Sequence, residues 1–402
     1  MLNKAKKAFV LILGFYLLLA VPVLAQDSQG NKVRYLVKSQ NRALKALLGV
    51  QHNFDSGFTT ELNKGQEEAF KRLVAKFGAE IEEITQYNLL APPDACSPWP
   101  ECKKNGEPEP SPSPEPTPEL GRSCYPDYQN PWGIEKVNGG SGGTGVNVAV
   151  LDTGVKIDHL DLSVGLCKDA TKRGIKDGCN DTAGHGTHVA GTIAANGGSD
   201  GKGIFGVAPE ANLWAIKVCG PSGCWTDDIA AGIEYVSDKG VNVINLSLGG
   251  NTESSLIRDA IDYASGSGIL VVAASGNDGP TLGSIDYPAA NPKVLAVGAI
   301  DSSETVANWS SRGINDNDYT IEEREVEFGA PGVSVESTDR NGCYNYKDGT
   351  SMATPHVAGL AAKLWQGSAD GTRVHLQDLA KLHDLYTVGD DPATGFGLPI
   401  AP

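Results

Sequence analysis

The segment VNVAVLDTG, residues 146–154, is an apolar, β-branched run that ends at Asp152 and a glycine-containing turn. A short continuous apolar run of this kind predicts a strand that is buried on both faces. Comparable runs occur at VNVINLSLGG, ILVVAASGN and KVLAVGAID, residues 241–250, 269–277 and 293–301, with helix-like segments between them. Strands that alternate with helices predict an α/β fold with a mainly parallel sheet covered by helices on both faces.

Polar residues stand at the ends of several predicted strands. Asp152 ends the first strand, the stretch SLGG at residues 247–250 ends another, and Asn277 follows a third. Ligands of open α/β sheets bind outside the carboxyl ends of the strands. We therefore expect a functional site at this edge of the sheet, in a domain that extends over residues 131–402.

Three segments place an aspartate, a histidine and a serine in that order: AVLDTGV around Asp152, GHGTHVAGT around His185 and GTSMATPHVAG around Ser351. A serine hydroxyl becomes a strong nucleophile when a histidine takes its proton, and a carboxylate holds that histidine in the required tautomer. Each residue alone has a simpler interpretation, since an aspartate after a strand is commonly a turn residue and a serine at a helix start is commonly a cap. Their joint occurrence favours a serine hydrolase.

The three segments resemble those of the subtilisin-like serine proteases, the subtilase family, and the resemblance extends over residues 131–397. The order aspartate, histidine, serine is that of subtilisin and differs from the orders of chymotrypsin and the α/β-hydrolases. The resemblance implies a three-layer αβα fold, with Asp152 orienting the histidine, His185 as general base and then acid, and Ser351 as the nucleophile that forms an acyl-enzyme. It also implies that Asn277 is an oxyanion-hole donor, although its segment NDG is consistent with an ordinary turn.

The resemblance further implies an extended cleft for protein or peptide substrates. One edge is the loop CGPSGC, residues 219–224, and the residues on the other side are Ser247, Leu248, Gly249, Gly250, Ala274, Ser275 and Gly276. The stretch GSIDYPAA, residues 283–290, matches the lining of the pocket for the residue before the cleaved bond (P1). Asp286 stands there at a position often occupied by glycine. A carboxylate would favour lysine or arginine at P1, but a broad or large-apolar preference stays open, because the aspartate could face solvent or bind backbone.

A calcium ion is the cofactor that the resemblance implies, and no organic cofactor is expected. Asp161 matches a ligand of the family's strong calcium site. Asn196 and Asp200 belong to the loop NGGSDGKGIFGV, residues 196–207, which would supply the rest. This loop is two residues longer than the usual bacterial form, so its individual ligands are less certain than Asp161. Its oxygen-rich composition suits calcium.

The chain starts with a pattern typical of a secretory signal peptide over residues 1–25: lysines, a short apolar stretch and small residues before the expected cleavage point. An uncleaved membrane anchor is the alternative, but the apolar stretch is short for a span of about 20 residues. The formal net charge of −16 argues against nucleic acid as a partner. We expect a secreted, extracellular and monomeric protein with no membrane association after cleavage.

Residues 26–91 predict a small α+β unit. KVRYLVKS (32–39) has the pattern of a strand, EEAFKRLVAKFGAEIEEI (67–84) that of an amphipathic helix, and QYNLLA (86–91) that of a closing strand. The resemblance implies that this unit is a pro-domain, which assists folding and then inhibits the cleft. Residues 92–130 are a linker and the start of the mature region, and their proline-rich stretch GEPEPSPSPEPTPEL predicts an extended chain. The pro-region cut is expected near residues 91–94 or within this linker, where Arg122 is a candidate.

Eight cysteines suggest four disulfides in an exported protein. Local spacing suggests the pairs Cys96–Cys102, Cys167–Cys179 and Cys219–Cys224, which leaves Cys124 with Cys343, although spacing proves no pairing. A zinc site is the alternative, but no histidine lies at ligand spacing. Together these features predict a secreted serine endopeptidase made as a zymogen. The alternative is an inactive subtilase-fold protein that binds peptides.

Overall fold

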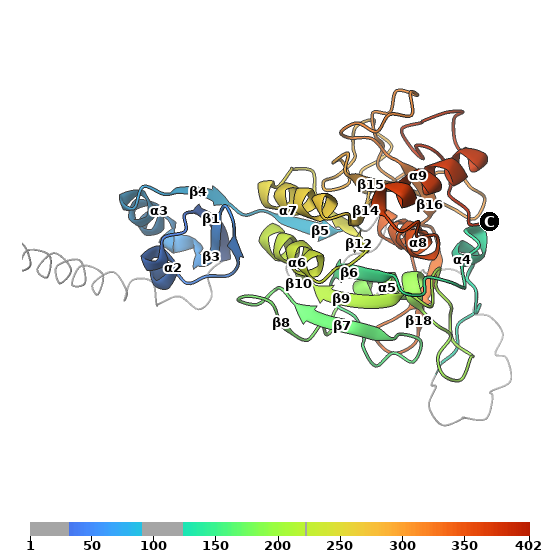
Figure 1. The fold of residues 1–402 in the computed structure, drawn as a ribbon, viewed down its shortest axis with the longest axis horizontal. Coiled ribbons are helices and arrows are strands. Elements are labelled where there is room, and N and C mark those ends of the chain that lie inside the picture. Colours follow the sequence, from blue (N-terminus) through green and yellow to red (C-terminus); the bar gives the residue numbers. More distant parts are fainter. Residues whose placement is uncertain (1–31, 91–123, 222) are drawn as a thin grey trace, which may run out of the picture. The chain divides into compact units, whose positions relative to one another are not determined.

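The computed structural model describes residues 32–90, 124–221 and 223–402. The chain divides into two compact units, Met1–Thr85 and Gln86–Pro402 (Figure 1). The predicted signal peptide, most of the predicted linker, and the pair Cys96 and Cys102 lie outside the described residues. No helix of the described part is long and apolar enough to cross a membrane.

The first unit is a four-stranded antiparallel sheet with two helices, as the α+β prediction requires. Its strands have the order β2-β3-β1-β4. Their bounds are β1 Lys32–Lys38, β2 Asn53–Phe54, β3 Gly57–Asn63 and β4 Glu80–Glu83. The helices are α2 Arg42–Leu48 and α3 Glu67–Lys76, with a 3-10 turn at Lys64–Gln66 before α3. Tyr35, Phe58 and Phe70 form the centre of a separate apolar core.

The predicted helix over residues 67–84 is too long. Helix α3 ends at Lys76, and Gly78 follows with a φ of 68°, a left-handed conformation that ends helices and favours glycine. The remaining residues form β4, which pairs with β1. The buried face of α3 is therefore limited to Phe70 and Val74.

The second unit contains a large, mainly parallel sheet, which confirms the predicted fold class. The strand order is β16-β15-β14-β12-β6-β9-β7-β8, and only β8 is antiparallel to its neighbour. The strands are β6 Asn147–Asp152, β7 Val164–Asp169, β8 Lys176–Asp177, β9 Asn212–Lys217, β12 Val243–Leu246, β14 Leu270–Ala274, β15 Val294–Ile300 and β16 Phe328–Pro331. The central strands β6, β12, β14 and β15 are almost entirely buried, as their apolar runs predict.

Helices cover both faces of this sheet, so the second unit has three layers (Figure 1). Helices α5 and α8 pack against each other on one face, and α6 and α7 pack against each other on the other. The helices are α4 Trp132–Lys136, α5 His185–Ala194, α6 Thr226–Asp238, α7 Ser255–Gly266, α8 Thr350–Lys363 and α9 Ala369–Ala380, followed by a 3-10 turn at Lys381–His383. Small residues fill α5 and α8, which lets both helices approach the sheet closely.

A smaller sheet with the order β10-β11-β5-β13 lies at one edge of the second unit. Its strands are β5 Gln86–Leu89, β10 Cys219–Gly220, β11 Gly223–Trp225 and β13 Leu248–Gly249, and a separate hairpin joins β17 Val335–Thr338 to β18 Tyr344–Lys347. The sequence predicts β5 as the closing strand of the N-terminal unit. The strand is present, but it pairs with β11 and β13 of the second unit instead. Strand β5 thus joins the β10–β11 hairpin to β13, whose pairing partner in this sheet is β5.

Three of the predicted disulfides are present in the second unit. They join Cys167 to Cys179, Cys219 to Cys224 and Cys124 to Cys343. The zinc alternative is therefore wrong for these six residues, since disulfide sulfurs are not available as thiolate ligands. The bridge between Cys219 and Cys224 closes the β10–β11 hairpin beside β5.

Candidate active site

Asp152 and His185 meet at the carboxyl edge of the sheet. Asp152 is the last residue of β6 and His185 is the first residue of α5. His185 Nδ1 lies 2.9 Å from both carboxylate oxygens of Asp152, and both residues are buried. The carboxylate fixes the tautomer with the proton on Nδ1, which leaves the lone pair on Nε2. This Nε2 is buried and has no hydrogen-bond partner among the described residues, as a general base awaiting a proton requires.

Asp181 holds the start of helix α5 in place, a role that sequence reasoning missed. Its carboxylate accepts hydrogen bonds from the backbone N–H groups of Gly184 and Thr187 and from the hydroxyls of Thr153 and Thr187. Burial alone would raise the pKa of Asp181, but the hydrogen bonds from Thr187 and Gly184 outweigh it and hold the pKa below its usual value. An aspartate just before a predicted helix start is the signal that could have identified it.

Ser351 is the second residue of α8. Its hydroxyl donates to the carbonyl oxygen of Ser247 at 2.9 Å, and the Ser247 hydroxyl donates back to the carbonyl of Ser351 at 2.9 Å. The hydroxyl of Ser351 therefore makes no bond to His185 in this structure, although helices α5 and α8 pack together. Hydrogen bonds between a nucleophile and its base often form only in the complex that reacts.

Asn277 follows β14 and is oriented by the residue before Ser351. Its side-chain oxygen accepts hydrogen bonds from the backbone N–H and the hydroxyl of Thr350, both at 3.1 Å. These two bonds fix the amide so that Nδ2 is left as a donor. Nδ2 is buried without a hydrogen-bond partner within residues 32–90, 124–221 and 223–402. A preoriented, unused donor is suited to an oxyanion that forms only during reaction.

Gly349 lies between a carbonyl group and two N–H donors, and sequence reasoning did not single it out. A β-carbon at Gly349 would lie 2.7 Å from the carbonyl oxygen of Leu90, 3.6 Å from the backbone nitrogen of Ser351 and 3.7 Å from Nδ2 of Asn277. The residue has a φ of 145°, a conformation that L side chains rarely adopt. Gly349 therefore leaves space beside two N–H donors, and the carbonyl of Leu90 occupies it.

Strand β5 brings Leu90 to this point as an extended chain. Leu89 pairs with Leu248 and Asn88 with Gly249 on one side. On the other side Tyr87 pairs with Cys224 and Gln86 with Trp225. Strand β13, in the segment predicted to bind substrate, and strand β11 thus lie on opposite sides of a peptide with its backbone held by antiparallel pairing.

Two of the other predicted substrate-binding residues, Ser275 and Gly276, lie against Asp286. Ala274 ends β14, and the carbonyl of Ser275 accepts from the backbone N–H of Asp286 at 2.8 Å. A β-carbon at Gly249 would lie 3.1 Å from Cβ of Asp286 and 3.3 Å from Cδ1 of Leu90. Asp286 and Leu90 therefore border the same pocket. A β-carbon at Gly276 would lie 2.7 Å from an Asp286 carboxylate oxygen, so Gly276 forms a further wall of this pocket.

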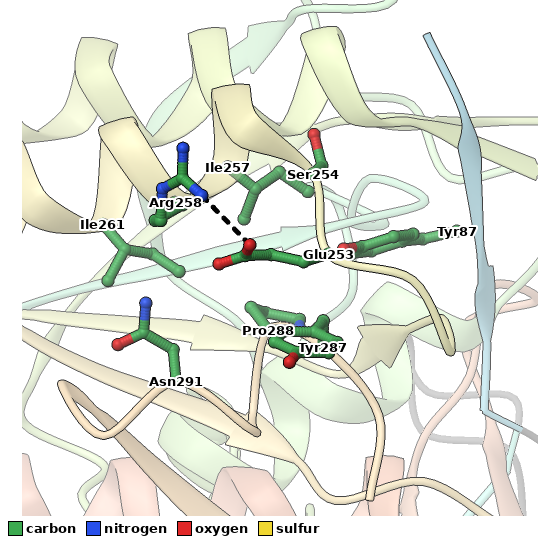
Figure 2. Close-up of a pocket in the computed structure, with 9 residues that line it drawn as sticks. All are labelled: Tyr87, Glu253, Ser254, Ile257, Arg258, Ile261, Tyr287, Pro288 and Asn291. Atoms are coloured by element: carbon green, nitrogen blue, oxygen red, sulfur yellow. Dashed lines mark hydrogen bonds and ion pairs between the residues drawn. The ribbon is translucent and has the colours of Figure 1, made fainter. Parts of the chain in front are cut away.

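Tyr87 lines a second pocket beside β5, which sequence reasoning missed. Figure 2 shows its ring directed toward Glu253, with Ile257, Ile261, Tyr287 and Pro288 also lining the pocket. The hydroxyl of Tyr87 donates to the carbonyl oxygen of Thr252 at 2.8 Å, and its side chain is almost fully buried. A β-carbon at Gly250 would lie 2.8 Å from the Tyr87 ring, so the glycine makes room for the ring.

The predicted calcium residues are only partly brought together. Asp161 is buried, and its Oδ2 accepts from the backbone N–H of Ile204 at 2.9 Å and from the hydroxyl of Tyr344 at 2.6 Å. The backbone N–H of Asn196 donates to the carbonyl of Asp161 at 2.9 Å. Asp200 is exposed at the loop tip and accepts from the backbone N–H of Lys202. Asp161 and Asn196 thus lie together, whereas Asp200 faces solvent.

Comparison with known proteins places these residues in a family context. The profile of the Subtilase family, Peptidase_S8, matches residues 143–393. Subtilisin of Bacillus sp. (strain TA39) is 39% identical over 408 residues, which cover 92% of this chain and 91% of that protein. Subtilisin Savinase of Lederbergia lenta is 42% identical, over 67% of this chain and 96% of that protein. Two solved structures, S41 Psychrophilic Protease and Sphericase, each match with a TM-score of 0.67 and 45% identity, covering 69% of this chain and 100% of theirs.

Proposed function

The chain belongs to the subtilase family of serine peptidases, and from this premise we propose that it is a secreted serine endopeptidase made as a zymogen. One observation carries the proposal. The carbonyl of Leu90 lies next to Gly349, which also borders the two proposed oxyanion donors, and it stands at the end of a peptide strand held on both sides. This is the arrangement that a substrate carbonyl needs for attack by Ser351.

The chemistry follows from the groups around that carbonyl. Ser351 Oγ attacks the carbonyl carbon, and His185 Nε2 takes its proton while Asp152 stabilises the imidazolium. Asn277 Nδ2 and the backbone N–H of Ser351 hold the negative oxygen of the tetrahedral intermediate. His185 then gives the proton to the leaving amine, which releases the carboxyl-side product. Water then attacks the acyl-enzyme while His185 takes its proton, and His185 returns that proton to Ser351 Oγ as the acid product leaves.

We also propose that the bond after Leu90 is the maturation site. Strand β5 ends one residue before this bond, and the Leu90 carbonyl stands where a scissile carbonyl would. Residues 26–90 then act as the intramolecular inhibitor, with Tyr87 and Leu90 seated in the two pockets. This position is at the start of the range expected from sequence, and it disfavours Arg122 as the first cut. Residues 1–25 and the disulfides support export to the extracellular space, and a monomer is the simplest form.

A structural calcium ion at Asp161 is a further part of the proposal. The oxygen atoms of Asp161, Asn196 and the loop carbonyls are of the kind that calcium takes, and the Asp161 carboxylate is buried under that loop. The exposed Asp200 is not proposed as a ligand. Calcium would supply positive charge that holds the loop against β7 and α5. Dialysis against a chelator should lower the melting temperature of the Ser351→Ala protein, with recovery on adding calcium but not magnesium, and an unchanged melting temperature would refute the site.

The test of the function uses active-site labelling and peptide hydrolysis together. The mature protein should react with a fluorophosphonate at Ser351 and should hydrolyse an internally quenched peptide that contains Gln-Tyr-Asn-Leu before the cleaved bond. The Ser351→Ala variant is the matched control and should do neither. Peptide binding without labelling or hydrolysis would support the alternative of an inactive peptide-binding protein.

A further inference from the structure

We propose that Asp286 makes the P1 pocket a proton-controlled selector. With its carboxyl group protonated, the pocket takes an apolar side chain such as leucine. With the group ionised, the pocket takes lysine or arginine. The inference deepens the proposed peptidase function and rests on it.

Asp286 and Leu90 both lie next to Gly249, at the predicted pocket for the residue before the cleaved bond. Asp286 has an exposed fraction of 2% and Leu90 of 9%, so little water reaches the space between them. Gly249 is adjacent to both side chains, since a β-carbon there would contact Cβ of Asp286 at 3.1 Å and Cδ1 of Leu90 at 3.3 Å. Any side chain larger than hydrogen at this position would fill the pocket. Gly249 is therefore shared by Asp286 and by the residue before the proposed cleaved bond, and Gly276, beside Asn277, lies next to the Asp286 carboxylate.

The surroundings of Asp286 oppose the ionisation of its carboxyl group. Burial is the largest cause and the negative charge of Asp278 adds to it, so that together they raise the pKa of Asp286 to about 7. The nearby phenols add no charge. Burial is the main cause that raises the pKa of Tyr287 to about 12, and burial also raises the pKa of Tyr87. Both phenols are therefore neutral in the range where Asp286 titrates.

The cations of the flanking segments are directed elsewhere. The guanidinium of Arg312 donates to the carbonyls of Ser310 and Ala307. The guanidinium of Arg324 donates to the carbonyl of Gly283. Within the described residues no ion pair of Asp286 is present, so its charge is available to a substrate ammonium or guanidinium.

The two protonation states of Asp286 favour different substrates for a physical reason. A neutral carboxyl group next to Leu90 leaves no buried charge, so an apolar side chain covers it at little cost. An ionised carboxylate covered by leucine would lose its water without gaining a partner, which is strongly unfavourable. Lysine or arginine replaces the lost hydration with a charge-assisted hydrogen bond. The preference should therefore reverse as the pH rises through the pKa of Asp286.

The experiment compares two peptides that differ only at P1, Gln-Tyr-Asn-Leu and Gln-Tyr-Asn-Lys before the same cleaved bond. The ratio of kcat/KM for lysine to that for leucine is measured with the mature protein between about pH 5.5 and pH 9.5. The pH dependence of the catalytic step is common to both peptides and cancels in the ratio. We expect the ratio to rise at least tenfold across this range, with a single midpoint. A ratio independent of pH would overturn the inference.

Three variants make the result specific. Asp286→Asn keeps the shape without the charge, and Asp286→Gly removes the group, so both should give a flat ratio that favours leucine. Asp278→Asn should move the midpoint to lower pH, because it removes the neighbouring negative charge. A pH-dependent ratio retained by Asp286→Asn would overturn the inference. Failure of the wild-type protein to cleave either peptide would instead refute the proposed function, so the two failures are distinguishable.

Discussion

Substituting Gly349 with alanine tests the geometry of the oxyanion site directly. The new β-carbon would lie 2.7 Å from the Leu90 carbonyl oxygen, which is too close for contact, but 3.6 Å and 3.7 Å from Ser351 N and Asn277 Nδ2, which are ordinary contacts. The substitution should therefore exclude the substrate carbonyl while leaving the donors in place. The φ of 145° adds backbone strain of about 1–3 kcal/mol.

The expected loss in kcat/KM is about 10²–10³-fold, the size measured when one oxyanion donor is removed from subtilisin, a relative of this chain. The assay is hydrolysis of the quenched peptide containing Gln-Tyr-Asn-Leu, with stability measured by denaturant unfolding in the Ser351→Ala background. Gly268→Ala is the matched control, since Gly268 also has a positive φ, of 75°, and no atom within 4 Å of its β-position. It lies at the opposite end of β14 from Asn277.

The control should lose about 1 kcal/mol of stability for its positive φ and keep its activity. Gly349→Ala should lose both stability and activity. A Gly349→Ala variant that retains more than about a tenth of the wild-type kcat/KM would refute the placement of the scissile carbonyl, because such a small loss is below that of removing a single donor.

Three further predictions follow from individual contacts. Asn277→Ala should lower kcat by about 10²–10³-fold with little change in KM, because its donor acts on the oxyanion only, and a change confined to KM would contradict this role. His356 is fully buried with its pKa lowered to about 4, chiefly by burial, so the unfolded state binds more protons as the pH falls below about 6.5. Between pH 6.5 and 4 the free energy of unfolding of the Ser351→Ala protein should fall by about 3 kcal/mol because of this residue. If a His356→Asn variant in the same background loses as much stability over this pH range, His356 is not the cause. Arg373→Met should cost about 3 kcal/mol, because the bidentate partner of Arg373, Glu327, is fully buried, and a loss below about 1 kcal/mol would contradict this.

Local features of the chain could be predicted because they depend on short stretches of sequence. The apolar runs that end at Asp152 and before Asn277 specify buried strands, and the small residues after His185 and Ser351 specify helices that approach the sheet closely. The disulfide of the β10–β11 hairpin follows from the short spacing of Cys219 and Cys224. Such features require no knowledge of distant partners.

Other features depend on contacts between distant segments. Nothing in QYNLLA indicates that β5 pairs with β11 and β13, because an extended segment fits any free strand edge. The role of Asp181 requires a donor from Thr153, 28 residues earlier in the chain, to meet the donors at the start of α5. Gly78 and Gly349 are both glycines, but Gly78 ends a helix and Gly349 leaves space for a carbonyl group. Only the fold distinguishes these uses.

The most direct test of the account is the mass spectrum of the secreted products of the wild-type chain and of Ser351→Ala. The wild type should yield a fragment with Leu90 as its C-terminal residue and a mature chain that begins at Ala91 or later. The Ser351→Ala chain should keep the bond after Leu90 intact. A cut at that bond in the Ser351→Ala chain, or a wild-type product still joined across it, would contradict the claim that Ser351 attacks the carbonyl of Leu90.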